Sequence, residues 1–266
     1  MVPPSLLSNM DILFTLRHFF TAKYRNGFGV HSPNIFEFFT KVIFSKEDFD
    51  YSQAELSLVR FKSSSQKIMV TSAGAKGDGS KCERSVRDIA KSSSSYGKYG
   101  QLLQRIAAYL KPNWILELGT SLGIGTIYMA SGSPSSNIIT VEACPETAKV
   151  ASDNFKLLEL DNITSIHGDF DVVLEDILSN NDPFGLIYVD GNHTYEATKR
   201  YFEMIAANSD ENTVVIFDDI NWSRGMAKAW DEIKSDPKTV VAIETMRMGI
   251  VFFNTKLTQK IYCTRF

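Results

Sequence analysis

Acidic side chains stand at the ends of short apolar runs in this sequence. Glu142 ends one such run, and Asp169 follows the next. A carboxylate can accept hydrogen bonds from both hydroxyls of a ribose, and an acidic residue about 20 residues after a glycine turn is placed to do so. Glu142 follows Gly119 at about that spacing. We therefore predict that Glu142 binds a ribose, that Asp169 accepts from an adenine amino group and that Phe170 packs on the adenine ring.

A second acidic group follows two later apolar runs. Asp190 ends the first of these runs, and Asp218 and Asp219 close the second. Adjacent strand ends of a parallel sheet meet at one edge, so these carboxylates should converge and repel one another unless a cation or a proton neutralises them. His193 can accept a proton near neutral pH, which makes it the candidate general base, with Asp190 as its catalytic partner. It could equally cap the helix that begins near Thr194.

A glycine-rich turn precedes both groups, in the segment ELGTSLGIG. Such a turn lets the backbone approach a cofactor closely. Ser121 occupies the second glycine position of the dinucleotide fingerprint G-x-G-x-x-G, which argues against NAD. The predicted cofactor-binding residues are Glu117, Gly119, Thr120, Ser121, Gly123, Gly125, Glu142, Ala143, Asp169, Phe170 and Asp190.

Alternating strand-like and helix-like segments position these residues and predict an α/β fold. The expected strands are Trp114–Leu118, Ile138–Glu142, Ile163–His167, Gly185–Asp190 and Val214–Asp218, followed by a C-terminal antiparallel hairpin of Val240–Thr245 and Ile250–Asn254. The expected helices are Ile124–Ala130, Pro145–Leu160, Val172–Leu178, Tyr195–Ala207 and one near Met226–Lys234. The pattern indicates a doubly wound, mostly parallel, Rossmann-like sheet of seven strands.

An additional helical region precedes this fold. The first 61 residues hold ten of the 18 phenylalanines, in helix-like stretches at Ile12–Tyr24 and Pro33–Phe44. Ser63–Ser95 is rich in Ser, Gly and Lys, and we expect a mobile loop there with a short helix around Glu83–Ala90. This places an N-terminal region at residues 1–95 and the cofactor-binding domain at 96–266. We predict that the aromatic N-terminal region forms a homodimer interface.

Composition excludes several classes of partner. A formal net charge of -3 gives no general attraction to nucleic acid or to anionic lipid. Asp11, Arg17 and Lys23 interrupt the N-terminal apolar stretches before they reach the roughly 20 residues of a membrane span, and no export signal is expected. Three widely separated cysteines form neither a disulfide framework nor a zinc knuckle. We expect a cytoplasmic protein.

The segment LELGTSLGIGTIYMA resembles motif I of the class I S-adenosylmethionine-dependent small-molecule O-methyltransferases. VEACPETAKVASDNFKLLELDNI is similar to the second-strand segment of that family, and Tyr99–Leu103 resembles the G-Q-x-L segment that precedes its first strand. The resemblance covers roughly Ser95–Asn254. It implies S-adenosylmethionine as cofactor and methyl transfer to a hydroxyl oxygen of a small-molecule acceptor.

The resemblance also implies a metal. In the cation-dependent members, the positions of Asp190, Asp218 and Asp219 supply an oxygen-rich site for Mg²⁺ or Ca²⁺. Catechol-type enzymes usually have Asp-Asn at the fifth strand, whereas this chain has Asp-Asp. The pair of Asp-Gly-x-His and Asp-Asp is similar to macrolide-sugar O-methyltransferases, in which metal and histidine act together.

Three other functions remain open from the sequence. A nucleotide-dependent oxidoreductase is disfavoured by Ser121. A nucleic-acid N-methyltransferase would need its D-P-P-Y motif at the end of the fourth strand, whereas Asp182–Phe184 precedes that strand. A non-catalytic cofactor-binding or scaffold protein would keep the fold without turnover.

Overall fold

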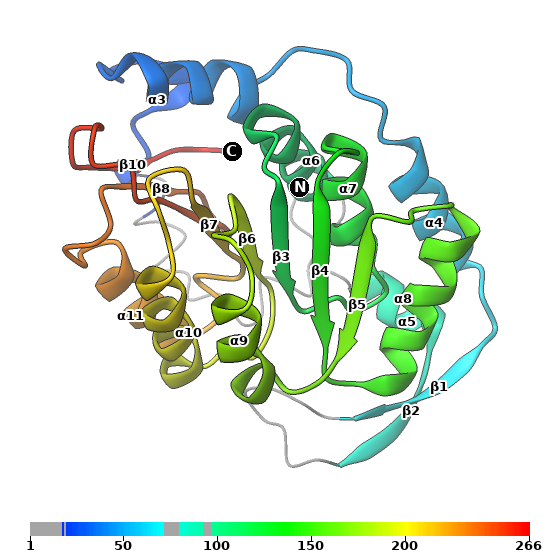
Figure 1. Ribbon diagram of the computed structural model, residues 1–266. Helices are drawn as coiled ribbons and strands as arrows, with labels where there is room; N and C mark the ends of the chain where they lie inside the picture. Colours follow the sequence, from blue (N-terminus) through cyan, green and yellow to red (C-terminus); the bar gives the residue numbers. More distant parts are fainter. Residues whose placement is uncertain (1–17, 19, 72–79, 93–96) are drawn as a thin grey trace. The chain divides into compact units, whose positions relative to one another are not determined.

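The computed structural model describes residues 18, 20–71, 80–92 and 97–266 (Figure 1). The chain packs as two compact units, one of residues 1–46 and 188–266 and the other of residues 47–187. This packing does not test the predicted boundary after residue 95, which stays a prediction. Most of the predicted helix Ile12–Tyr24 lies outside the described residues.

Three parallel strands form the centre of the unit 47–187. β3 (Trp114–Leu118) pairs with β4 (Asn137–Glu142), and β4 pairs with β5 (Ile163–His167). Helices follow these strands in turn, as α7 (Ile124–Gly132), α8 (Pro145–Leu157) and α9 (Phe170–Ser179). Each strand and helix lies where the apolar periodicity predicts it, with ends that shift by three residues or fewer. The predicted β-α alternation is confirmed.

Two helices of this unit, α4 (Ser52–Lys62) and α6 (Lys98–Leu110), were not predicted as elements. Both pack against α7. Gly132 makes the close approach of α6 and α7 possible, because a Cβ there would lie 2.2 Å from the backbone oxygen of Gln104. The contact between these helices therefore depends on a glycine at the end of α7.

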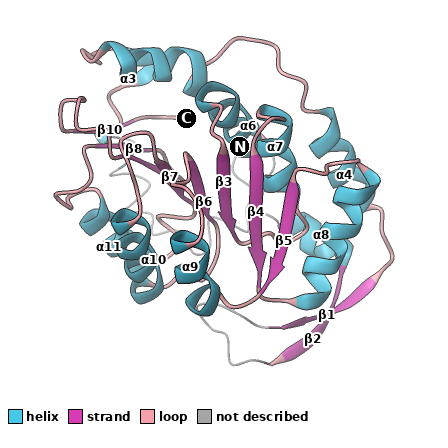
Figure 2. Cartoon of the chain, in the orientation of Figure 1, coloured by secondary structure: helices cyan, strands magenta, loops and turns pink. Residues whose placement is uncertain are grey.

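The expected loop Ser63–Ser95 is partly wrong. β1 (Lys67–Thr71) and β2 (Lys81–Ser85) form an antiparallel pair, drawn as magenta strands in Figure 2, and α5 (Val86–Ser92) follows them. Ile68 in β1 is buried, and β1 lies against α8. Tertiary contact thus gives strand structure to a segment whose composition is typical of a loop.

The other unit contains the C-terminal strands. β7 (Val214–Phe217) pairs antiparallel with β9 (Gly249–Phe252), and β9 pairs antiparallel with β8 (Val241–Glu244), which confirms the predicted hairpin. β10 (Lys260–Cys263) pairs with β8 in parallel and was not predicted. Helices α10 (Tyr195–Ala207) and α11 (Arg224–Ile233) pack together.

The main sheet has the strand order β10-β8-β9-β7-β6-β3-β4-β5 among the described residues, with β6 (Leu186–Val189) at the boundary of the two units. It therefore has eight strands where the sequence predicts seven, and the α/β, mostly parallel fold with an antiparallel hairpin is confirmed. The eighth strand is β10, whose four residues are too few to be distinguished from a loop by their sequence pattern.

Residues 33–43 of this unit are helical, as predicted. After η1 (Arg25–Gly27), α3 (Pro33–Phe38) begins with Pro33 in its first turn and continues into the π-helical η2 (Phe39–Ile43). Phe38 is buried and packs edge-on against Phe252, with ring centroids 5.2 Å apart. Within the described ranges, every helix is too short or too polar to cross a membrane.

Candidate functional site

The turn between β3 and α7 has the unusual backbone that its glycines allow. Gly119, Ser121 and Gly123 all have positive φ angles, of 110°, 49° and 79°. A Cβ on Gly123 would lie 2.5 Å from the ring of Phe155, so this position needs glycine for space as well as for conformation. Gly119 and Thr120 both donate their backbone N–H to the oxygen of Val141, at 3.0 and 3.2 Å, which ties the turn to the next strand.

Glu142 faces this turn from the end of β4. Its Oε2 accepts the backbone N–H of Ser121 at 2.8 Å, and its Oε1 accepts that of Cys144 at 2.9 Å. Burial raises the pKa of Glu142, and the hydrogen bonds from Cys144, Ser121 and Ala143 oppose that rise. Each carboxylate oxygen can accept a second hydrogen bond, so the side chain can orient the turn and also bind a diol.

A buried network lies beneath the turn. Thr126 and Thr140 both donate their hydroxyls to Oε2 of Glu117, and the hydroxyls of Thr140 and Thr120 are in contact. Glu117 is 1% exposed, and burial raises the pKa of its carboxyl to about 7 although the two threonine hydroxyls lower it. Gly125, in the first turn of α7, is also buried. The structure thus surrounds Glu117 with hydroxyl partners, and its cofactor contact stays a prediction.

Asp169 begins α9. It is the N-cap residue, and its side chain accepts the backbone N–H of Asp171 at 2.9 Å. Phe170 next to it is buried. The backbone N–H of Gly168 donates to the oxygen of Glu142 at 3.1 Å, so the segment before Asp169 lies beside the end of β4. The capping role is established by geometry, and the predicted adenine contact stays a prediction.

Three side chains converge in the other unit. Nε2 of His193 lies 3.6 Å from Oδ1 of Asp190 and 3.9 Å from Oδ2 of Asp219. The three offer one ligand atom each within 4.8 Å of one another. His193 is not the helix cap, because Thr194 is the N-cap of α10 and accepts the N–H of Ala197 at 3.2 Å. This leaves the imidazole of His193 facing the two carboxylates.

Asp218 has a partner that the sequence did not predict. Its side chain is fully buried and makes a two-point ion pair with Arg247, whose Nε lies 2.7 Å from Oδ1. The hydroxyl of Tyr188 lies 2.6 Å from Oδ2 of Asp218 and 3.1 Å from Oδ2 of Asp190. The structure therefore brings Asp190 and Asp219 together with His193, and it directs Asp218 to Arg247.

Arg247 was not among the predicted site residues. It lies between β8 and β9, in the hairpin turn that the sequence identifies, and its Nε is also 3.2 Å from Oδ1 of Asp219. Burial lowers the pKa of Arg247, but Asp218 and Asp219 outweigh that effect and hold it well above its usual range. An arginine in a turn gives no local sign that it will be buried against two aspartates.

The charges of this cluster fit a divalent cation. The cluster holds three carboxylates, from Asp190, Asp218 and Asp219, and one guanidinium, which pairs with Asp218 and Asp219. This leaves an excess of two negative charges when all are ionised. Burial and the neighbouring Asp218 raise the pKa of Asp219, whereas Arg247 and His193 oppose the rise. The oxygens of Asp190 and Asp219 suit Mg²⁺ or Ca²⁺, and the imidazole of His193 suits a transition-metal ion or proton transfer.

Part of the chain is similar to a known protein family. Residues 116–220 match the model of a methyltransferase domain. This match begins within β3 and contains the glycine turn, Glu142, Asp169 and the acidic pair of Asp218 and Asp219.

Two catechol O-methyltransferases are similar to this chain in sequence. The enzyme of Niastella koreensis is 28% identical over 141 residues, which cover 52% of this chain and 62% of the relative. The enzyme of Mycobacterium tuberculosis is 25% identical over 151 residues, covering 56% of this chain and 65% of the relative. The matched part of this chain thus spans less than two thirds of the length of each relative. 

A solved structure shows the same fold. The O-methyltransferase of Bacillus cereus in complex with SAH superposes with a TM-score of 0.55 at 19% identity, over 79% of this chain and 94% of the other. The family match and this fold confirm the predicted class I methyltransferase fold, and neither gives support to an oxidoreductase or a scaffold.

Proposed function

We propose that this protein transfers the methyl group of S-adenosylmethionine to a hydroxyl oxygen of a small molecule. The observation that carries the proposal is the turn after β3 joined to Glu142 through the backbone N–H of Ser121, within the matched methyltransferase domain. That arrangement presents the backbone of the turn and the half-buried carboxylate of Glu142 at the carboxyl ends of β3 and β4, where doubly wound folds bind their ligands.

The residues have separate tasks in this proposal. When bound, the cofactor supplies an electrophilic methyl group for an in-line displacement. Glu142 holds the ribose hydroxyls, and the turn of Gly119 to Gly123 accommodates the rest of the nucleoside. His193 takes the proton from the acceptor hydroxyl, since its ring lies beside two carboxylates that stabilise the resulting positive charge.

A divalent cation is the second part of the proposal. Asp190 and Asp219 would hold it, with His193 as a nitrogen ligand, and it would lower the pKa of the acceptor hydroxyl and orient that group. The catechol O-methyltransferase relatives make a hydroxyl-bearing small molecule the first acceptor class to try. We further propose a cytoplasmic location and a homodimer formed through the aromatic N-terminal region, where Phe28 and Phe36 are exposed.

A thermal-shift experiment tests the cofactor. S-adenosylhomocysteine, the product of the reaction, should raise the melting temperature of the purified protein, because a ligand that binds only the folded state stabilises it by mass action. NADH should leave the melting temperature unchanged. Stabilisation by NADH and none by S-adenosylhomocysteine would reject the proposal.

Chelation separates the two modes of acceptor activation. If a cation is needed, EDTA should abolish methyl transfer from labelled S-adenosylmethionine to a catechol, and the binding of S-adenosylhomocysteine should persist. If His193 acts alone as base, EDTA should leave the rate unchanged, and His193→Gln should remove it.

A further inference from the structure

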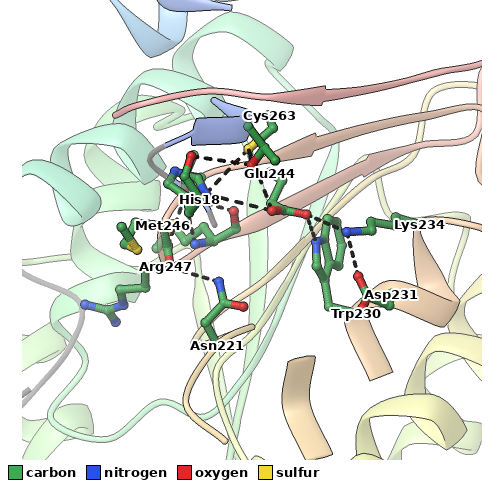
Figure 3. Close-up of polar contacts among 12 residues, drawn as sticks. His18, Asn221, Trp230, Asp231, Lys234, Glu244, Met246, Arg247 and Cys263 are labelled. Carbon is green, nitrogen blue, oxygen red and sulfur yellow. Dashed lines mark hydrogen bonds and ion pairs between the residues drawn. The ribbon is translucent and has the colours of Figure 1, made fainter. Parts of the chain in front are cut away.

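A second group of metal-ligand atoms lies in the unit of residues 1–46 and 188–266, apart from the acidic cluster. His18, Glu244 and Cys263 place Nδ1, Oε1 and Sγ within 4.8 Å of one another (Figure 3). His18 and Glu244 are buried, and Cys263 is partly exposed. The proposed methyl transfer uses none of the three.

Strand pairing explains how two of these side chains meet. Cys263 of β10 is the register partner of Glu244 in the parallel strand β8. Paired residues of neighbouring strands point to the same face of a sheet, so the thiol and the carboxylate are neighbours there. His18 comes from the N-terminal segment, more than 200 residues away in sequence.

The separations are those of a tetrahedral metal site. Sγ of Cys263 lies 3.5 Å from Nδ1 of His18 and 3.7 Å from Oε1 of Glu244, and Nδ1 lies 3.8 Å from Oε1. Tetrahedral Zn²⁺ with ordinary bond lengths separates such sulfur, nitrogen and oxygen ligands by about 3.3–3.6 Å. Small side-chain movements would close this triangle around one ion.

The remaining contacts orient the carboxylate for this role. Oε2 of Glu244 accepts from Nε1 of Trp230 at 2.8 Å and from Nζ of Lys234 at 2.7 Å. Both donors lie on the oxygen that is turned away from the thiol and the imidazole, as Figure 3 shows, so Oε1 is directed at the other two ligands. Outer contacts that fix the position of a ligand in this way are typical of metal sites.

A catalytic thiol relay is a poorer interpretation of the same three residues. A relay needs the thiol on one imidazole nitrogen and the carboxylate on the other. Here the thiol and the carboxylate both approach Nδ1. Three groups around a common centre can share a cation, but the imidazole does not lie between the thiol and the carboxylate as a proton relay requires.

We propose that His18, Glu244 and Cys263 form a thiolate-containing site for a zinc-type divalent ion. The fourth position is open to water or to Thr21, whose hydroxyl lies 3.5 Å from Sγ of Cys263. The ion would tie the N-terminal segment to the ends of β8 and β10. Its role would be structural, because the ion would join segments that are far apart in the sequence and the group is distinct from Asp190, His193 and Asp219.

Cobalt substitution tests the site on the full-length protein. Co²⁺ bound by a thiolate gives a near-ultraviolet charge-transfer band, and a tetrahedral ligand set gives strong visible bands. The wild-type protein should show both at one equivalent of Co²⁺, and Zn²⁺ should displace them. The acidic cluster has no thiolate, so an ion held by Asp190 and Asp219 cannot produce the charge-transfer band.

Two variants and a matched control complete the test. Cys263→Ser should abolish the charge-transfer band and weaken Zn²⁺ binding by more than the roughly 10- to 100-fold that loss of an outer contact causes. His18→Gln should weaken binding to a similar degree. The control Cys82→Ser removes an exposed cysteine and should change neither property. Absence of the band in the wild-type protein, or its persistence in Cys263→Ser, would overturn the proposal.

Discussion

A buried carboxylate lies beneath the turn after β3, and another lies in the acidic cluster after β6 and β7, but the two have different kinds of partner. Glu117 receives two threonine hydroxyls, whereas Asp218 receives the guanidinium of Arg247. Because the neutral hydroxyls offset only part of the effect of burial, the pKa of Glu117 rises to about 7. The carboxylate of Asp218 is instead compensated by the charge of Arg247, so it depends on the presence of that residue. The stability that depends on Glu117 should therefore change with pH, and the stability that depends on Asp218 should change when its partner is lost.

The largest expected effect comes from breaking the ion pair. Asp218→Ala should lower the free energy of unfolding by about 3–5 kcal/mol, because it leaves the buried charge of Arg247 without its two-point partner. Urea unfolding measures the change. Asp219→Asn is the matched control: asparagine tolerates the positive φ of 50° at this position, and Arg247 keeps Asp218. A loss in the control as large as in Asp218→Ala would contradict the assigned roles.

The second effect concerns the pH dependence of stability. The pKa of Glu117 is about 7 in the folded protein, against an ordinary value of 4.5 for a glutamate side chain. Between these values the unfolded chain releases a proton that the folded protein retains, so stability falls as pH rises from about 4.5 to about 7 and then levels off. The total loss is about 3 kcal/mol, since one pKa unit corresponds to about 1.36 kcal/mol.

Glu117→Gln should remove that fall, which urea unfolding at several pH values would detect. The exposed Glu146→Gln serves as the control and should keep the wild-type profile. If Glu117→Gln and the wild type lose stability equally over this range, then Glu117 is not the group responsible.

A smaller effect is expected for cofactor binding. Glu142→Ala should weaken the binding of S-adenosylhomocysteine by about 1–3 kcal/mol, the usual range for hydrogen bonds to a charged group. Calorimetric titration provides the measurement, and Glu146→Ala controls for the loss of a nearby charge. Unchanged affinity would restrict Glu142 to its observed contacts with Ser121 and Cys144.

The smallest expected effect separates two roles of Asp169. Asp169→Ala should lower stability by about 1 kcal/mol, because it removes the N-cap of α9. Asp169→Ser can keep the cap but not the carboxylate. Weaker binding of S-adenosylhomocysteine by Asp169→Ser at wild-type stability would establish the adenine contact, whereas wild-type affinity would leave only the cap.

Local sequence predicted most of the fold around the first region. The apolar run at Trp114–Leu118 became β3 with unchanged ends, since strands buried on both faces need continuous apolar residues. Ile163–His167 also became β5 with unchanged ends, although β5 is a partly exposed strand at the edge of the sheet. The glycines of the following turn predicted its positive φ angles at Gly119 and Gly123, because a residue without Cβ is the usual one there.

Contacts between distant residues decided the rest. β1 and β10 become strands through tertiary contacts with α8 and β8, which no local pattern records. The sequence placed Asp218 with Asp190 and Asp219, but only the packed hairpin brings Arg247 to it. Sequence determines which side chains stand at the strand ends, because that depends on local periodicity; tertiary structure determines their partners, because charge pairing in a buried site depends on distance in space and not along the chain.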